Sequence, residues 1–407
     1  NPCPFGSASS SLAEGTKIKM TKKSILLIFK DKKKITKNHE FWIDKFSKEY
    51  SVNDFYLYDY LNCTNKKIIE KINDLIITKN IETALIEGDH LALNDYLFIN
   101  SINKKIKKGL FLGDDPEWHQ VNLITAFACD FVLTDSISAL KFKEMGIQSI
   151  FCPVETNEEI FKNYNQNKDI DVLIFGRNKP ETQEYLDLLD QNNIKYLSVD
   201  PYMEVSNTIE KLAKLISKSK IVINLTKTLN GKKFFNPLTK FKYGFFPKGR
   251  VYMTGLCYTL CLSEYAPSNE LLFPKGEIPS FKSKDQFIDK LKMYLNDEKK
   301  LNYDTKIFYE SCLKYSDKEY IKVLKKFIDN VVIIKNKKNI KIPLWYYFIS
   351  IKQYFRLRSK FGRKAAFLKQ FFENFSLPFY LIPINLFFFI RFLPNFIMNN
   401  IFKRKHD

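Results

Sequence analysis

The sequence predicts a protein of the α/β class with two open parallel sheets, each covered by helices, and a basic aromatic extension at the C-terminus. From Lys23 onward, runs of four to six apolar residues alternate with longer polar stretches of helical period. That alternation is typical of parallel sheets with helices on both faces. A polar linker after Pro153 divides this alternation into two series of expected strands and helices. With 407 residues and 45% hydrophobic content, the chain is long enough for two domains and an extension.

Residues 1–19 differ from the rest of the chain, because they are small, polar and unpatterned. We expect them to be a tag, or a vector-derived or pre-start segment, without ordered structure. They hold no uninterrupted apolar stretch, so they make a poor secretory signal. The first expected strand, at 24–29, begins shortly after Met20.

The first unit is expected over residues 20–153. Its strands follow the apolar runs SILLIF, SVNDFYLY, TALIEG, GLFLGDD and FVLTD, at residues 24–29, 51–58, 83–88, 109–115 and 131–135. Helices are expected between them at 39–48, 66–78 and 137–145. Strands that are joined through helices run parallel in one sheet.

The second unit is expected over residues 154–330, where the same alternation starts again after the linker. Its strands follow DVLIFGR, KYLSVDP, SKIVINLT and YTLCLSE, at residues 171–177, 195–201, 219–226 and 258–264. The two units show no internal sequence repeat. Two units of one class predict two facing domains with a cleft between them, where ligands bind.

The extension, residues 331–407, carries much of the net charge of +20, because it holds fifteen Lys and Arg against two acidic residues. This distribution disfavours a nucleic-acid groove through the folded body and favours one cationic surface at the C-terminus. Within 345–372, aromatic residues alternate with Lys and Arg, and they fall roughly on one helical side at positions 345, 348, 355, 361, 368, 371 and 372. A basic helix rich in Trp and Phe is typical of an anionic membrane surface.

The last apolar run, residues 375–402, contains a single charged residue, Arg391. It is long enough to span a bilayer, but its prolines and Asn385 would leave kinks or unpaired polar groups in hydrocarbon. We expect a monotopic or shallowly re-entrant anchor, with residues 345–405 on the inner face of the cell membrane and the basic end KRKHD among cytoplasmic headgroups. A spanning helix and a packed, water-soluble helix remain alternatives. An RNA-binding extension is a weaker one, since the Phe run at 386–392 is too apolar for a solvated groove.

The seven cysteines lack the paired spacing of zinc ligands, and several lie inside apolar runs. This pattern is typical of buried free thiols in a reducing cytosol. Cys257 and Cys261 would have to bind a metal across a helix-to-strand transition, with no second pair nearby. We therefore expect no bound metal and no resident cofactor.

Candidate catalytic residues in the first unit follow the strand at 109–115. Asp114 and Asp115 stand at its end, Pro116 directs the chain, and His119 comes shortly after. Two carboxylates and an imidazole at this place suit general acid–base catalysis. The alternative is an Asx turn that caps a helix starting at Trp118. His119 is the best candidate for a general base, and His90, which also follows a strand, is a second.

Candidate ligand-binding residues in the second unit also follow strands. Gly176 closes one strand and places Arg177 and Lys179 at a helix N-terminus, which suits a diphosphate, although surface cations after strands are common. In the segment from Pro247 to Asp297, a basic turn with Lys248 and Arg250 could meet a phosphate. Glu264 and Glu270 come just past the carboxyl end of the strand at 258–263, where α/β sheets bind ligands, and could accept hydrogen bonds from sugar hydroxyls.

Seven segments in the same order and spacing resemble a known family, over roughly residues 105–320. They are GDDP (113–116), FVLTD (131–135), 146–161, DVLIFGR (171–177), 217–225, 249–264 and 273–295. The chain resembles the spore-maturation-protein-like, glycosyltransferase family 4-like branch of the GT-B glycosyltransferases. That resemblance implies two Rossmann-like domains with a nucleotide diphosphate sugar, the co-substrate, held by the C-terminal one. It also implies metal independence, since helix dipoles and cations neutralise the leaving diphosphate.

The resemblance further implies roles for individual residues. Gly176, Arg177 and Arg250 would lie near the diphosphate, and Glu264 and Glu270 near the ribose or donor sugar. Asp114 and Asp115 would face the cleft.

Two positions depart from the family pattern. Relatives usually carry Glu three residues after the arginine and Gly after the alanine/cysteine pair, whereas this chain has Met253 and Tyr258. The sequence therefore supports two hypotheses. The first is a membrane-associated hexosyltransferase that acts on a lipid-linked or cell-envelope glycan in polysaccharide biosynthesis. The second is a catalytically silent GT-B protein that binds a glycan or a partner enzyme.

Overall fold

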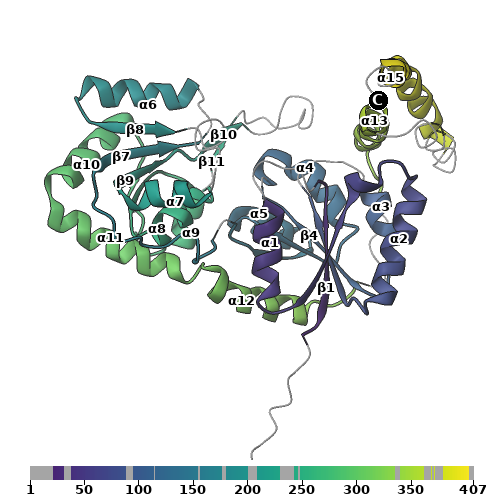
Figure 1. Cartoon of the computed structure of the whole chain (residues 1–407), viewed down its shortest axis with the longest axis horizontal. Helices are drawn as coiled ribbons and strands as arrows, with labels where there is room; N and C mark the ends of the chain where they lie inside the picture. Colours follow the sequence, from purple (N-terminus) through teal and green to yellow (C-terminus); the bar gives the residue numbers. More distant parts are fainter. Residues whose placement is uncertain are drawn as a thin grey trace, which may run out of the picture.

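The computed structural model shows two parallel-sheet α/β units joined by a linker and a returning helix (Figure 1). Two α/β units are what the apolar runs predict. The structure describes residues 22–31, 38–88, 95–113, 115–154, 156–176, 180–199, 209–229, 243–245, 248–334, 340–361, 368, 371 and 379–402.

The first unit has a six-stranded parallel sheet in the order β2-β1-β3-β4-β5-β6. Its strands are β1 (Ser24–Phe29), β2 (Ser51–Tyr56), β3 (Thr83–Glu87), β4 (Lys107–Phe111), β5 (Phe131–Thr134) and β6 (Gln148–Phe151). Its helices are α1 (Asn38–Ser47), η1 (Leu57–Tyr60), α2 (Asn65–Thr78), α3 (Tyr96–Ser101), α4 (Asp115–Ala126) and α5 (Ser136–Glu144). The expected strand at 109–115 was too long, because the chain enters α4 at Asp115.

The second unit has a five-stranded parallel sheet in the order β13-β12-β9-β7-β8, with a separate antiparallel pair, β10 and β11. Its strands are β7 (Ile170–Phe175), β8 (Tyr196–Val199), β9 (Ser219–Asn224), β10 (Lys227–Leu229), β11 (Tyr243–Phe245), β12 (Leu260–Glu264) and β13 (Ser280–Phe281). Its helices are α6 (Pro180–Gln191), α7 (Ile209–Ser217), α8 (Arg250–Leu256), α9 (Pro267–Leu272), α10 (Lys284–Asn296) and α11 (Glu298–Leu313).

Helix α12 (Asp317–Asn330) returns from the second unit to the first along the lower edge of Figure 1. Its buried face, Ile321, Leu324 and Ile328, packs in one cluster with Leu27 of β1 and Phe131 of β5. The spacing of these three residues is that of one helical side. The chain therefore crosses between the units twice, once through the linker before β7 and once at the start of α12.

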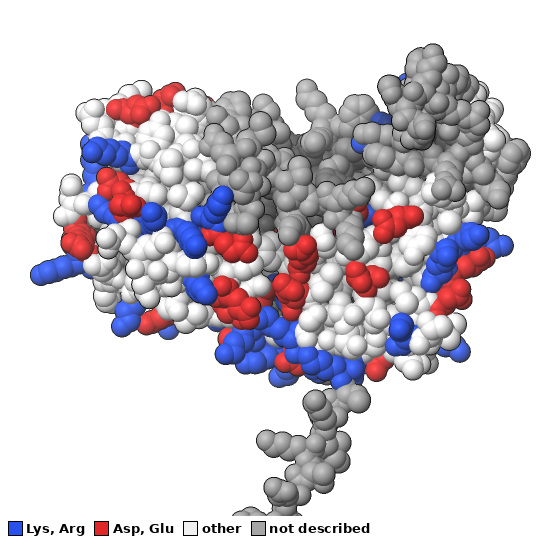
Figure 2. Space-filling model, in the orientation of Figure 1, with Lys and Arg blue, Asp and Glu red and all other residues white. Residues whose placement is uncertain are grey.

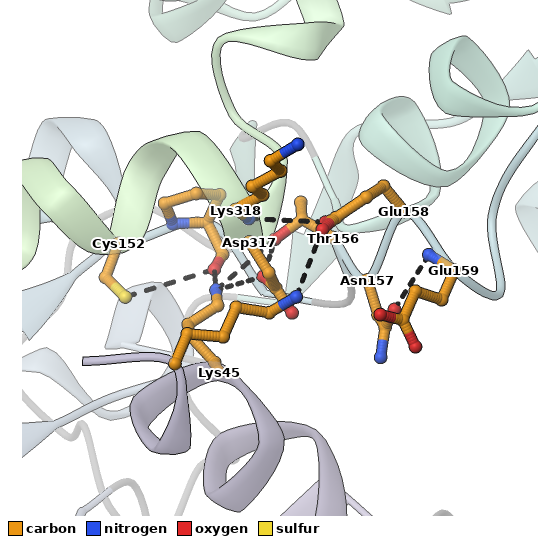
Figure 3. A network of polar contacts seen from close by, with 10 residues as sticks. Lys45, Cys152, Thr156, Asn157, Glu158, Glu159, Asp317 and Lys318 are labelled. Carbon is orange, nitrogen blue, oxygen red and sulfur yellow. Dashed lines mark hydrogen bonds and ion pairs between the residues drawn. The ribbon is translucent and has the colours of Figure 1, made fainter. Parts of the chain in front are cut away.

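A buried polar network ties these two crossings together (Figure 3). The Lys45 ammonium on α1 lies 3.0 Å from the Asp317 carboxylate, and the Thr156 hydroxyl donates to the same carboxylate at 2.6 Å. Lys45 also donates to the carbonyl of Pro153. Burial raises the pKa of the neighbouring Cys152 thiol to about 11, so this thiol stays protonated at neutral pH. We call Lys45, Thr156 and Asp317 the hinge network.

The extension packs on the first unit through α13 (Leu344–Phe361). Tyr346 is fully buried there, where its hydroxyl accepts the Tyr96 N–H at 2.9 Å and lies 2.8 Å from the Thr125 hydroxyl. Tyr354 donates to the buried carboxylate of Asp95. These contacts make α13 part of the first unit's core, on the side away from the hinge network.

The second helix of the extension, α15 (Ile382–Phe402), comes after the short helix η3 (Phe379–Leu381) and packs against α13. The aromatic residues that the sequence places roughly on one helical side differ in exposure: Phe355 is buried against Phe389 of α15, whereas Phe348 is exposed. The helical period shows which residues share a side, but not that a second helix covers it.

Two surface properties bear on the predicted partners. Among the helices that the structure describes, none combines the length and the apolarity needed to cross a membrane. On the face shown in Figure 2, Lys and Arg are interspersed with Asp and Glu over the described part of both units.

Candidate functional site

The first unit places a paired carboxylate and imidazole just past the carboxyl end of β4. Asp115, the first residue of α4, is fully buried, and its Oδ2 lies 2.6 Å from Nδ1 of His119, one turn later. Its Oδ1 accepts a hydrogen bond of 2.8 Å from the Asn122 side chain. His119 packs against the ring of Phe142 and keeps 20% of its side chain exposed. An ionised Asp115 accepts the Nδ1 proton, which leaves Nε2 as the basic atom of the imidazole.

The sequence left open whether these acids only cap a helix that starts at Trp118. In the structure the helix starts at Asp115, whose carboxylate contacts two side chains of the same helix, so this alternative is wrong for Asp115. Asp114 and His90 lie outside the described residues.

A second buried carboxylate, which the sequence analysis missed, stands at the carboxyl end of the neighbouring strand β5. Asp135 caps α5 and accepts the N–H groups of Ile137 and Ser138, each at 3.1 Å. Burial, and then the charge of Asp115, raise the pKa of Asp135. The signal was present in the motif FVLTDS, because an Asp just before a helix is a preferred cap.

In the second unit, the structure brings Gly176 and Arg250 together at the carboxyl end of β7. Gly176 has a φ of +135°, and a Cβ built on it would lie 2.6 Å from a guanidinium nitrogen of Arg250. The same guanidinium lies 5.5 Å from the centre of the Phe175 ring. Only glycine allows this backbone conformation and this close approach. Arg177 and Lys179 lie outside the described residues.

Lys248 and Glu264 both form hydrogen bonds to the backbone of the segment after β9. Oε2 of Glu264 accepts the N–H groups of Thr226 at 2.9 Å and Lys227 at 3.0 Å. The Lys248 ammonium donates to the carbonyl of Lys227 at 3.4 Å. These contacts fix the Glu264 carboxylate at the carboxyl end of β12.

Glu270, which lies on α9, has a different setting. It is exposed and accepts a hydrogen bond of 2.9 Å from the hydroxyl of Tyr265. The Lys282 ammonium lies 4.3 Å from the centre of the Tyr265 ring. Glu264 thus ends β12 and Glu270 follows it, but only Glu264 is tied into the backbone of a neighbouring strand end.

The two departures from the family pattern have distinct structural settings. Met253 is buried in an apolar cluster with Leu173 and Phe175, so its side chain contributes packing and no charge. Tyr258 has a φ of +57°, the left-handed conformation that glycine adopts at little cost. The Lys168 ammonium donates to the Tyr258 carbonyl at 2.8 Å, and burial lowers the pKa of Lys168 to about 8.

The cysteines in the described residues are free thiols, and all but Cys63 are buried, as the apolar runs around several of them predict. Burial raises the pKa of Cys257 to about 12, so it is a protonated thiol at neutral pH. In the same residues, no cluster of three or more His, Cys, Asp or Glu side chains is placed to hold a metal ion.

Residues 156–314 match the family model described as glycosyl transferase-like. The second unit is therefore similar to the glycosyl transferase-like family. The matched segment holds Gly176, Arg250, Glu264 and Glu270, and it ends where α11 gives way to α12. Comparison with curated protein sequences gives no match.

Comparison with solved structures extends the similarity to both units of the fold. Sucrose-phosphate synthase from Thermosynechococcus elongatus superposes with a TM-score of 0.50 at 10% identity, over 75% of this chain and 98% of that one. A glycosyltransferase from Rickettsia africae ESF-5 superposes with a TM-score of 0.50 at 11% identity, over 77% of this chain and 99% of that one. At these identities the similarity shows the fold alone, and two parallel-sheet units agree with the GT-B fold that the resemblance implied.

Proposed function

We propose that the protein is a metal-independent GT-B glycosyltransferase of the hexosyltransferase type. It moves a sugar from a nucleotide diphosphate sugar to a lipid-linked or cell-envelope glycan at the cytoplasmic face of the membrane. The observation that carries the proposal is the glycosyl transferase-like match over the unit in which Gly176 and Arg250 meet at a strand end.

The donor diphosphate binds beside Arg250, at the strand end that Gly176 closes. The carboxyl end of a parallel strand is where α/β sheets bind their ligands. Gly176 lets the Arg250 guanidinium lie against the backbone, and Arg250 supplies a permanent cation with a fork of donors. As the bond between the sugar and the diphosphate breaks, Arg250 stabilises the negative charge on the leaving group.

The acceptor hydroxyl is activated from the first unit. His119 takes the hydroxyl proton on Nε2 as the acceptor oxygen bonds to the anomeric carbon. Asp115 holds the imidazole through Nδ1 and stabilises the imidazolium that forms. Asn122 in turn fixes Asp115 through its second oxygen.

The extension supports the membrane part of the proposal. On η3 and α15, Tyr380, Phe387 and Ile390 are 58%, 51% and 59% exposed. The extension around them is strongly basic. Exposed apolar side chains beside cations are suited to an anionic leaflet, on which the helix lies without crossing it.

A binding and turnover screen tests this function. We expect at least one UDP-, GDP-, ADP- or dTDP-sugar to raise the thermal midpoint of the full chain and to be turned over without added metal. No thermal shift and no turnover with any of them would contradict the proposal. Turnover that requires a divalent metal would contradict its metal independence.

The burial of Met253 favours a second candidate function. A carboxylate that relatives usually place here is replaced by a side chain in the apolar core. The protein would then be a catalytically silent GT-B protein that binds a glycan or a partner enzyme. Turnover in the wild type that is lost in Arg250→Ala or Glu264→Ala would exclude this candidate.

A further inference from the structure

A buried chain of hydrogen bonds runs from the C-terminal extension into α4, the helix that carries His119. The hydroxyl of Tyr346, on α13, lies 2.8 Å from the hydroxyl of Thr125 on α4. Thr125 donates its single hydroxyl proton to the carbonyl of Val121, at 3.0 Å. The proton between the two hydroxyls therefore belongs to Tyr346, and the chain of donors is directed from the extension into α4.

The same Tyr346 hydroxyl also holds the start of α3. It accepts the N–H group of Tyr96 at 2.9 Å, so its proton points to α4 and one of its lone pairs to α3. Tyr354, about two turns later on α13, donates to the carboxylate of Asp95, which caps α3. Helices α3 and α4 pack against each other. The extension thus holds two adjoining helices of the first unit through two tyrosine hydroxyls.

Two sides of α4 have different neighbours. The side towards α13 carries Val121 and Thr125, which are one helical turn apart. The adjoining side carries the carboxylate, imidazole and amide of Asp115, His119 and Asn122. A helix of twelve residues moves as one element, so a displacement at Thr125 also displaces His119.

We propose that Tyr346 is a positioning residue, which acts through Thr125 and α4 to hold the His119 imidazole in place for proton transfer. Its effect on turnover rests on the proposed function, whereas its effect on the His119 ring does not. Tyr346 lies beyond residues 156–314, which match the family model, and beyond residues 105–320, which carry the resemblance. Neither the match nor the resemblance therefore implies this role, which belongs to the extension of this chain.

The test compares Tyr346→Phe with Tyr347→Phe in the full chain. Each variant removes one buried hydroxyl from α13, but the ring of Tyr347 contacts Tyr380 within the extension. The chain has four histidines, so their imidazole signals can be resolved by NMR after ¹⁵N labelling, and His119→Gln identifies the signals of His119. Turnover of the nucleotide sugar selected in the screen gives kcat and KM.

In Tyr346→Phe, the ring signals of His119 should shift, because α4 loses its hydrogen bond to the extension. The value of kcat should fall about tenfold, since a displacement of about 1 Å can cost about 10²-fold and the loss of one hydrogen bond moves the helix by less. KM for the nucleotide sugar should not change, because the proposed donor site is in the second unit. A role in stability alone would lower the thermal midpoint and leave the kcat of the folded protein unchanged.

Thr125→Val removes the same hydrogen bond from the α4 side, and it serves as the test if Tyr346→Phe fails to fold. It should shift the His119 signals and lower kcat by a similar factor. The double variant should lose less than the product of the two single losses, because both changes remove one and the same bond. Tyr347→Phe should keep the wild-type His119 signals and the wild-type kcat.

The outcomes separate this proposal from the proposed function. Unchanged His119 signals in both Tyr346→Phe and Thr125→Val would overturn the positioning role, whatever the turnover. Shifted signals at the wild-type kcat would overturn it as well, and so would equal effects in Tyr347→Phe. Shifted signals in a protein that turns over no nucleotide sugar would support the hold of Tyr346 on His119, while contradicting the proposed function.

Discussion

Two of the contacts between the units of this protein differ in how their polar groups are satisfied. In the hinge network, the charged groups of Lys45 and Asp317 are buried together, and Thr156 donates to the same carboxylate. At the contact between α5 and α9, the hydroxyls of Ser136 and Ser268 and the amide of Asn269 are also buried but have no partner among the described residues. Each unpaired buried polar group costs about 1–3 kcal/mol. The hinge network is therefore expected to stabilise the joint between the units, whereas the polar groups at the contact between α5 and α9 lower its stability.

The largest effect expected from this comparison is at Asp317. Asp317→Ala leaves the Lys45 ammonium buried without its carboxylate and should lower the free energy of unfolding by about 3–5 kcal/mol. Glu319→Ala, on the same helix, is the control, because Glu319 pairs with Lys322 at the surface and should lose less than about 1 kcal/mol. Urea unfolding measures both. Equal losses would refute a special role for the hinge network.

Deleting a hydroxyl should lower the stability at the hinge network, but not at the contact between α5 and α9. Thr156→Val keeps the shape but removes the hydrogen bond to Asp317, and should cost about 1–3 kcal/mol. Ser268→Ala removes a hydroxyl that has no partner, and should leave the stability unchanged or raise it by up to about 1 kcal/mol. Denaturant unfolding of the two variants measures both effects, and the midpoints are compared between curves with the same m-value. A cost at Ser268 as large as that at Thr156 would remove the distinction between the two contacts.

The smallest effect expected is a pH dependence that arises from Asp135. Its folded pKa is raised by burial and by Asp115, although Lys141 and the α5 amides act against this. The folded state therefore binds this proton more tightly than the unfolded state, so stability is gained as the pH falls through the raised pKa and lost as it rises. Asp135→Asn cannot ionise, and its stability relative to the wild type should increase as the pH rises from about 4 to 8. A constant difference over this range would show that Asp135 does not titrate as argued.

The strands could be predicted from the sequence because a short apolar run such as 24–29 is recognisable by its own residues, without knowledge of the helices that cover it. The pairing of Asp115 with His119 is explained by their spacing on one helix. By contrast, the helical period of α12 shows an apolar side but not that this side packs on the first unit's sheet. The burial of Phe355 could not be predicted for the same reason, because the helical period of α13 does not show that α15 covers it. The contact between α5 and α9 joins residues far apart in the sequence, and no local pattern carries that information.

The central claim is that Arg250 and His119 act together on a nucleotide sugar bound between the units. The most direct measurement is the initial rate of turnover of the nucleotide sugar selected in the screen, for the wild type, Arg250→Ala and His119→Ala. Lys322→Ala, at an exposed site on α12, serves as the control. Each of the two site variants should fall by about 10²–10³-fold, while the control keeps the wild-type rate. Full activity in either site variant would contradict the account.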